Sequence, residues 1–237
     1  RIGIPASIEG TGRALSINAL LIVVGLFSTS VVAAFGIGTR VFSVIFLPAI
    51  AVARGVETMS GQNIGAGKYD RAEQANYVAA KGLFFVLGLL GLAIFLVPEP
   101  IVSVFTTDAE VLEVGAEFLR YVSLSFGFIG IMRAFTGGFR GAGKTIIAAV
   151  ISVVTLAGIR LPVAFIASQG LLPTDFWFLG STDVRGIWIA FFVSNIVGAA
   201  IAWLWFRRGT WREGDVRGSP AGGELENDDV ELSSGLD

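Results

Sequence analysis

A few polar and ionisable side chains lie inside long apolar stretches of this sequence, and they are the residues that could do chemistry. The first group is Glu9, Arg13 and Asn18. Glu9 and Arg13 are four residues apart, so they share one face of a helix, and the order Glu then Arg favours an ion pair. An amide such as Asn18 could coordinate a ligand or bond a neighbouring helix. Ionisable groups are costly in apolar surroundings, so the pair is either functional or a structural ion pair that reaches the aqueous surface.

Other ionisable residues lie further along the chain. Arg54 and Glu57 are three residues apart and are expected to pair. Arg133 is expected to extend its guanidinium to the aqueous surface, as long basic side chains do. Arg160 lies deeper in its apolar stretch. Arg40 lies at mid-depth or at the outer surface, depending on where the preceding helix ends.

The composition excludes several kinds of chemistry. Histidine and cysteine are absent from the sequence, so disulfides and thiol or imidazole chemistry are excluded. Any proton or cation coupling in this segment must use carboxylates, hydroxyls, amides or backbone carbonyls. No paired carboxylates of the kind needed for acid–base catalysis are present. We therefore expect no enzyme activity, no catalytic residue, no metal site and no cofactor.

Long apolar stretches must position these side chains. Of the 237 residues, 54% are hydrophobic and 15% are charged, against roughly 25% charged in soluble domains. A bilayer core about 30 Å thick requires about 20 apolar residues in a helix. Six stretches meet this length: Pro5–Phe27, Val31–Met59, Val78–Val97, Val114–Phe135, Ile146–Ala167 and Ile187–Phe206. The sequence therefore predicts an all-α membrane protein, with a bundle of six transmembrane helices over residues 1–206.

Turn residues mark the breaks between these helices, with one ambiguity. The first two helices separate either at Ser28–Ser30 or at the glycine-rich Gly36–Arg40. Thr107 is predicted to cap the helix that follows it. Pro48 and Pro162 lack the amide hydrogen that a helix interior requires, so each predicts a bend.

Charge is distributed unevenly between the two sides of the predicted bundle. One side carries Arg1, Lys68, Arg71, Lys81, Arg140, Lys144, Arg207, Arg208, Arg212 and Arg217. The opposite loops carry Glu99, Asp108, Glu110, Glu113, Asp175 and Asp183 against one base, Arg185. Because cytoplasmic loops are enriched in basic residues, both ends are predicted to be cytoplasmic, in a multi-pass protein of the cell membrane.

The end of the chain changes composition. Tryptophans are expected in the interfacial belts of the bilayer, at Trp177, Trp188, Trp203, Trp205 and Trp211. From Glu213 to Asp237 there are eight acids and a single base. Such a segment buries too little apolar surface to fold, so residues 207–237 are predicted to be an acidic, disordered cytoplasmic tail.

One segment matches a nucleotide-binding pattern. Residues Gly138–Thr145 fit G-x-x-x-x-G-K-[ST], which cradles phosphates where it follows a buried strand. Here a membrane helix precedes it, so we expect a glycine turn at the lipid headgroups and no nucleotide or nucleic acid as a partner.

Gly65–Lys68 and Gly141–Lys144 have the same four residues, either as an internal repeat or as convergent turn chemistry.

Several segments resemble one family. They are Ala33–Arg40 (AAFGIGTR), Leu47-Pro48-Ala49 and Gly61–Lys68 (GQNIGAGK), with Gly3-Ile4-Pro5-Ala6 before Glu9, Gly138–Thr145, and Arg160-Leu161-Pro162. Together they resemble the MATE (multidrug and toxic compound extrusion) transporters over about residues 1–206. The resemblance is most specific in Gly61–Lys68.

The resemblance implies the C-terminal six-helix lobe of a twelve-helix antiporter, partnered by an N-terminal lobe within the bilayer. It implies export of small organic compounds, often cationic, driven by Na⁺ or H⁺. It places the first break at Ser28–Ser30 and Arg40 in a buried position. Glu9 lies near a carboxylate that some members use for coupling. Those members also use an acid in the stretch matching Ser123–Arg133, where this chain has none, which leaves the N-terminal lobe as the alternative coupling site.

We therefore expect Glu9, Arg13 and Asn18 to face the central cavity of an alternating-access transporter, with Arg40 and Arg160 as secondary candidates. A related flippase for lipid-linked sugars is the alternative, since arginines outnumber acids within the spans. Further arginines in the N-terminal lobe would favour the flippase, and carboxylates there would favour the antiporter.

Overall fold

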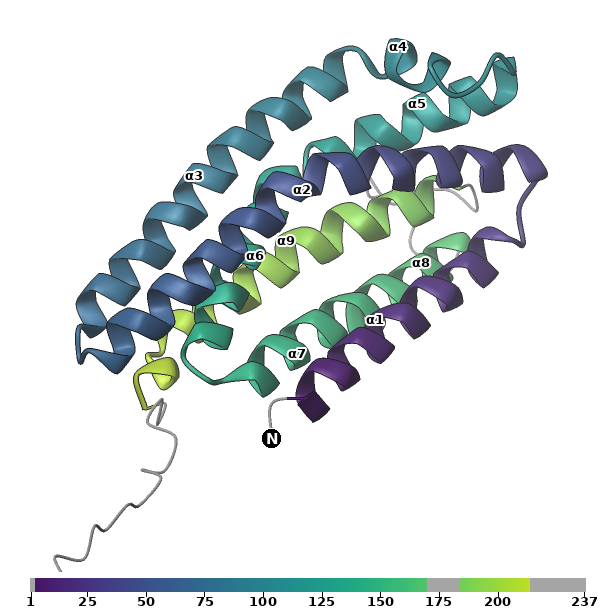
Figure 1. Ribbon diagram of the computed structural model, residues 1–237. Helices are drawn as coiled ribbons and strands as arrows, with labels where there is room; N and C mark the ends of the chain where they lie inside the picture. Colours follow the sequence, from purple (N-terminus) through teal and green to yellow (C-terminus); the bar gives the residue numbers. More distant parts are fainter. Residues whose placement is uncertain (1–2, 170–183, 214–237) are drawn as a thin grey trace, which may run out of the picture.

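The computed structural model describes residues 3–169 and 184–213, and only the backbone of residues 3–9, 13 and 213. All the described elements are helical (Figure 1). They are α1 (Gly3–Val24), α2 (Thr29–Gly65), α3 (Tyr69–Leu96), α4 (Pro98–Ser103), α5 (Ala109–Ser123), α6 (Phe126–Gly141), α7 (Thr145–Val153), the π-helix η1 (Val154–Arg160), α8 (Leu161–Ser168), α9 (Arg185–Arg207) and the 3₁₀ turn η2 (Thr210–Glu213).

The helices form one bundle around α6. Helix α6 packs against α2, α3 and α9, while α1 packs mainly against α7, η1 and α8. Figure 1 shows α1 and α7–α8 side by side along one edge, with α3 at the opposite edge. The all-α membrane fold predicted from the sequence is confirmed.

Most of the predicted spans appear as helices of membrane length. Among the described residues, α2, α3, α9 and the continuous segment Thr145–Ser168 are each long and apolar enough to cross a bilayer. The pair α5 and α6 meets the same test together, but the two helices meet at an angle of 52°. Helix α1 occupies the place of the first predicted span, and its residues Gly10–Val24 form a shorter apolar helix.

The predicted continuous helix over Val114–Phe135 is wrong, because the chain breaks between α5 and α6. The hydroxyl of Ser125 donates to the Val122 carbonyl at 2.7 Å, and that of Ser123 donates to the Arg120 carbonyl at 3.1 Å. Serine side chains that bond nearby carbonyls offer the backbone an alternative to the regular helix.

The prediction of a Thr107 cap is also wrong, since the Asp108 carboxylate accepts from the Val111 amide at the start of α5.

The break between the first two helices falls between Val24 and Thr29, which settles the ambiguity in favour of Ser28–Ser30. Arg40 consequently lies inside α2. Its side chain is exposed on the surface of this lobe, so the buried position expected for it in the complete transporter stays a prediction. Pro48 also lies inside α2, and Figure 1 shows this helix changing direction near its middle.

The two Gly-Ala-Gly-Lys segments end α2 and α6 with the same hydrogen bonds. Gly67 and Gly143 have φ of 72° and 74°, a left-handed conformation that favours glycine. The Lys68 amide donates to the Asn63 carbonyl at 2.7 Å, and the Lys144 amide donates to the Phe139 carbonyl at 2.8 Å. The phosphate-loop pattern at Gly138–Thr145 is therefore a helix C-cap, followed by the start of α7.

The basic loops gather at one end of the bundle. Figure 1 shows the ends of α2, α6 and α9 and the start of α1 at that end, with the α3–α5 connection at the other. This arrangement agrees with an even number of crossings.

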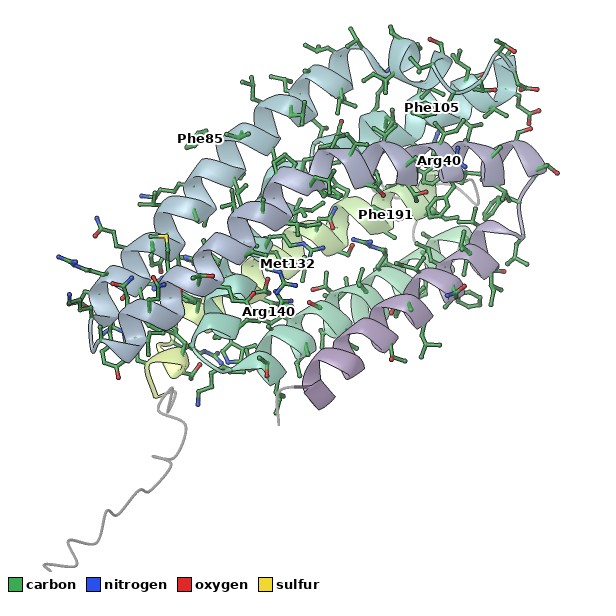
Figure 2. The ribbon with its side chains drawn as sticks, viewed as in Figure 1. Arg40, Phe85, Phe105, Met132, Arg140 and Phe191 are labelled. Carbon is green, nitrogen blue, oxygen red and sulfur yellow. The ribbon has the colours of Figure 1, made fainter. Side chains whose placement is uncertain are left out.

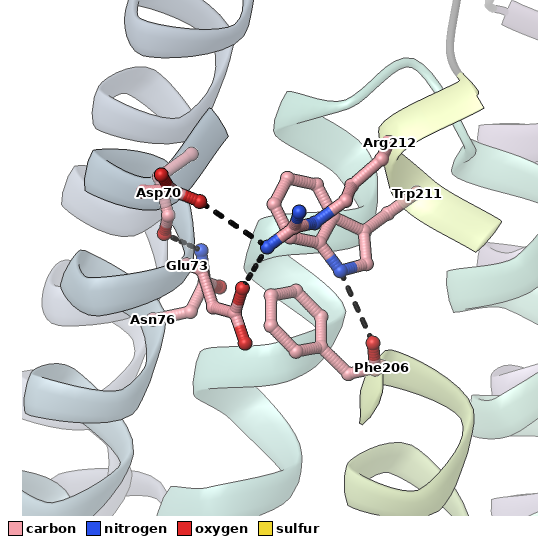
Figure 3. Close-up of polar contacts among 7 residues, drawn as sticks. Asp70, Glu73, Asn76, Phe206, Trp211 and Arg212 are labelled. Carbon is pink, nitrogen blue, oxygen red and sulfur yellow. Dashed lines mark hydrogen bonds and ion pairs between the residues drawn. The ribbon is translucent and has the colours of Figure 1, made fainter. Parts of the chain in front are cut away.

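The folded part continues beyond the boundary predicted at Phe206, because η2 folds back onto the bundle (Figure 3). Trp211 is 2% exposed and stacks on Phe206, with ring centroids 5.0 Å apart. Its Nε1 donates to the Phe206 carbonyl at 3.1 Å. Arg212 forms ion pairs with Asp70 and Glu73 at the start of α3. Residues 214–237 lie outside the described residues, so the disordered tail stays a prediction.

Two of the tryptophans expected at the membrane interface are core residues instead. Trp211 is buried as above, and Trp188 in α9 is fully buried against Phe35 and Phe118. Trp203 is 37% exposed on the surface of α9. Trp177 lies outside the described residues. Among the described tryptophans, some therefore pack in the aromatic core and others face the surface.

We predict that Gly137→Ala destabilises the bundle. A Cβ at Gly137 would lie 2.6 Å from the Ala53 carbonyl oxygen, so α6 and α2 would have to separate. Overpacking of this kind costs about 1–3 kcal/mol. The thermal unfolding midpoint of the purified full-length protein in detergent would fall, whereas Gly82→Ala should leave it unchanged or higher, since nothing lies within 4 Å of a Cβ there. Equal midpoints for the two variants would contradict the close packing.

We predict that Trp211→Ala loosens the end of α9. Truncating a buried aromatic side chain costs about 3–5 kcal/mol, and here the loss would also release Arg212 from α3. Proteolysis of the C-terminal segment should become faster in the variant. Trp203→Ala, which removes an exposed tryptophan from the same helix, is the matched control and should be cleaved at the wild-type rate.

Candidate functional site

A cavity of about 190 Å³ lies inside the bundle, between α1, η1 and the α2–α6–α9 side. Its polar lining consists of Arg133, Thr136, Ser152, Thr155, Arg160 and Asn195. Its apolar lining includes Phe42, Phe46, Met132 and Phe191. Figure 2 shows Met132 and Phe191 toward the middle of the bundle and Phe85 and Phe105 on its outside.

An aromatic cluster forms one wall of the cavity. Phe42 of α2 contacts the rings of Phe118, Phe126 and Phe191, with centroids 5.2–6.3 Å apart. Such tilted and edge-on pairs are favourable beyond the area they bury. Four helices, α2, α5, α6 and α9, are thereby joined beside the cavity, which gives its polar residues a rigid support.

Arg160 is held at the end of η1 by residues of α9. Its Nε–H donates to the Ser194 hydroxyl at 2.9 Å, and its Nη2–H donates to the Asn195 amide oxygen at 2.7 Å. The guanidinium lies 4.1 Å from the centre of the Phe191 ring, a cation–π contact. Among the described residues, no carboxylate pairs with Arg160. Neutral groups alone therefore orient this charge.

The hydrogen-bond chain continues to the break between α5 and α6. Asn195 Nδ2 donates to the Ser125 hydroxyl at 2.8 Å, and Ser125 donates to Val122. Asn195, Ser194 and Ser125 are all buried. The chain thus joins η1, α9 and the α5–α6 break, and buried polar groups of this kind are costly to leave unpaired.

The π-helix brings Thr155 and Arg160 toward the same cavity. Pro162 has no amide hydrogen, and its ring crowds the carbonyl four residues earlier, at Gly158. The wider i→i+5 turn over Val154–Arg160 relieves this crowding. Residues five apart lie closer to one face in a π-helix than in an α-helix, and both Thr155 and Arg160 line the cavity. The sequence predicted a bend at Pro162, and the irregularity seen in the structure is a local widening of the helix into a π-helix just before this proline.

Arg133 is the second arginine at the cavity. It lies in α6, is half-buried and lines the cavity. The prediction that its side chain extends to the aqueous surface stays a prediction.

The other predicted site residues are not gathered at this cavity. Asn18 is exposed, and its amide donates to the Ala14 carbonyl of its own helix at 2.8 Å. Arg40 is exposed on α2 (Figure 2). Glu9 and Arg13 lie on α1, but their side chains are outside those described. The predicted pair Arg54–Glu57 is confirmed at 3.1 Å.

Sequence reasoning missed Ser125, Ser194 and Asn195. Asn195 is the only amide inside the stretch Ile187–Phe206, and that isolation was a usable signal. The two serines gave none, because serine is common in membrane helices and usually bonds its own backbone. Buried Asn76, which donates to Ser60 Oγ at 2.8 Å between α3 and α2, was missed as well.

Comparison with known proteins identifies the family. The MatE family model matches residues 5–166. The chain belongs to the MatE family. This confirms the resemblance found in the sequence. A multi-pass membrane protein follows from the family together with the apolar helices.

Two curated relatives illustrate the match. The chain is 29% identical over 222 residues to "Probable multidrug resistance protein NorM" of Thermotoga maritima, covering 90% of this chain and 44% of the relative. It is 28% identical over 193 residues to the "FAD transporter" of Shewanella oneidensis, covering 81% and 40%. The chain thus spans less than half the length of these relatives.

A solved structure has the same fold. The Vibrio cholerae MATE transporter VcmN in the bent form superposes with a TM-score of 0.79 at 23% identity, covering 90% of this chain and 46% of that one. At this identity the likeness concerns the fold alone. One lobe of such a transporter is therefore the architecture of this chain.

We predict that Ser125→Ala destabilises the lobe. It removes the acceptor for Asn195 and leaves a buried amide hydrogen unpaired, which costs about 1–3 kcal/mol. Thermal unfolding of the full-length protein in detergent should shift down. Ser43→Ala is the control, because that exposed hydroxyl bonds only its own helix, at Thr39, and its midpoint should stay at the wild-type value.

Proposed function

We propose that this chain is one lobe of a cation-coupled antiporter that exports organic compounds across a membrane by alternating access. The observation that carries the proposal is the MatE match over residues 5–166, on a fold that holds a polar cavity inside one bundle. The relatives named for multidrug resistance support export of organic compounds. Nothing in the comparisons favours a flippase for lipid-linked sugars.

The proposed partner is an N-terminal six-helix lobe, with this chain as the C-terminal one. The chain covers 39–45% of the curated relatives compared, which fits half of a two-lobed transporter. Rocking of two bundles about a site near the middle of the membrane would alternate its access. Pro48 in α2 and the π-helix before Pro162 are places where the helices depart from regular geometry.

The coupling ion is proposed to be Na⁺ or H⁺. Glu9 on α1 is the candidate carboxylate of this lobe, beside Arg13. The segment around the α5–α6 break, Ser123–Arg133, contains no acid. Coupling through this lobe therefore depends on Glu9, and the alternative is a site in the N-terminal lobe.

The proposed location is the cell membrane, with both ends of this segment in the cytoplasm. The basic loops at one end of the bundle support that orientation. The acidic residues 214–237 are proposed to be a disordered tail on the same side. A cationic substrate stays a prediction of the family resemblance, and the arginines of the cavity argue against it.

We predict that Glu9→Gln weakens ion-driven efflux if this lobe couples transport. Removing the carboxylate removes the group that would bind H⁺ or Na⁺. Efflux of a fluorescent organic dye, cationic or anionic, that the wild-type full-length protein exports from proteoliposomes under imposed Na⁺ or H⁺ gradients would fall at least about tenfold, in the range of a lost charge-assisted interaction.

Glu110→Gln, at the exposed start of α5, is the matched control and should keep wild-type efflux. Unchanged efflux and unchanged ion dependence in Glu9→Gln would assign coupling to the other lobe. Absence of ion-driven efflux in the wild-type protein, for every organic compound tried, would overturn the proposed function.

A further inference from the structure

The cavity of this lobe has cationic and neutral polar lining, without a described acid. We propose that it binds the carboxylate or phosphate group of an anionic organic substrate, and that Arg160 is the residue that contacts that group. The proposal rests on the transport function proposed above and adds the charge of the substrate.

The charge balance of the cavity supports an anion. Arg133 and Arg160 both line it, and none of its described lining residues is Asp or Glu. The described partners of Arg160 are a hydroxyl, an amide oxygen and an aromatic ring. A charge within the apolar layer is costly unless it is paired. An anionic substrate would pair with the Arg160 guanidinium, whose described partners carry no negative charge.

The geometry of Arg160 also suits this role. A guanidinium carries five N–H donors in a planar fork that matches a carboxylate or a phosphate. The described hydrogen bonds engage Nε–H and one Nη2–H, which fixes the plane of the group against α9. Phe191 lies against it at 4.1 Å. The donor group is therefore held in place before a ligand arrives.

The size of the cavity fits one charged end of a substrate. Pockets that enclose a drug-sized ligand usually measure about 300–1,000 Å³, whereas this cavity measures about 190 Å³. Its apolar wall, with Phe42, Phe46 and Met132, would contact the part of the substrate next to the anionic group. The rest of the substrate would lie against the other lobe.

The test compares two dyes that share a xanthene ring system and differ in charge. Binding of carboxyfluorescein, an anion, and of rhodamine 123, a cation, is measured by fluorescence anisotropy with purified full-length protein in detergent. The wild-type protein should bind carboxyfluorescein more tightly than rhodamine 123. A preference for rhodamine 123, or no binding of carboxyfluorescein, would overturn the proposal.

Variants assign the anion to Arg160. Arg160→Gln should weaken carboxyfluorescein binding at least about tenfold, while Arg160→Lys, which keeps the charge but loses the planar fork, should weaken it less. Arg207→Gln removes an exposed arginine that lies over Trp203 at the end of α9, so it is the control for non-specific binding to charge and detergent. Equal loss in Arg207→Gln would overturn the assignment.

Asn195→Asp separates the binding role from a structural one. The side chain keeps its shape and its acceptor for Arg160, and it places a carboxylate against the guanidinium. A structural role for Arg160 predicts unchanged carboxyfluorescein binding, and the proposal predicts a loss of about tenfold or more at a temperature where the variant is still folded. The thermal midpoint itself should fall, since the substitution removes the donor to Ser125. If the proposed antiport function is wrong but the anion site is right, transport in proteoliposomes will be absent. Carboxyfluorescein will still bind more tightly than rhodamine 123, and its binding will still depend on Arg160.

Discussion

Inside a bilayer no water is available to pair polar groups, so each polar side chain in a membrane helix must bond another part of the protein. Many of the described hydroxyl and amide groups of this lobe meet the requirement in one of two ways, whereas Asn76 Oδ1 and Trp188 Nε1 are buried without a hydrogen-bond partner. Ser16, Ser43 and Thr155 return their hydroxyls to carbonyls of their own helices. Ser125, Ser194, Asn195 and Arg160 instead bond one another across η1, α9 and the α5–α6 break. The second arrangement joins distant segments, so it fixes the position of the cavity.

Close approach of the helices around α6 depends on small residues. Gly137 and Gly141 face the backbone of α2, and Gly127 and Gly130 face α3 at Phe84 and Leu83. Without side chains at these positions, backbones approach closely and gain van der Waals contact, the main attraction between helices in lipid. The aromatic clusters around Phe42 and Phe206 then fill the space toward α9. Helix α6 is therefore both the centre of packing and the carrier of Arg133.

The arginines that line the cavity have different surroundings from the charged residues at the surface of the lobe. The ion pairs in the described part of the chain, such as Arg212 with Glu73 and Arg185 with Glu117, include exposed residues near the helix ends. The described partners of Arg160 at the cavity are instead a hydroxyl, an amide oxygen and an aromatic ring. A pair of exposed ions is worth little in water, whereas an arginine oriented in an apolar layer sets which ligands can approach. Recognition of an anionic group is accordingly the role that we propose for Arg160.

The sequence by itself determined the membrane environment, the all-α fold, the grouping of basic loops and the family, because hydropathy and turn residues act locally along the chain. Gly67 and Gly143 were recognisable as turns for the same reason. The tertiary structure alone decided that the fourth span breaks at Ser125, that Trp188 and Trp211 belong to the core, and that Arg133 lines a cavity while Arg40 is exposed. It also brought Arg160 to Asn195, 35 residues away. These outcomes depend on which helix faces meet in space, and a periodic apolar sequence does not specify its neighbours.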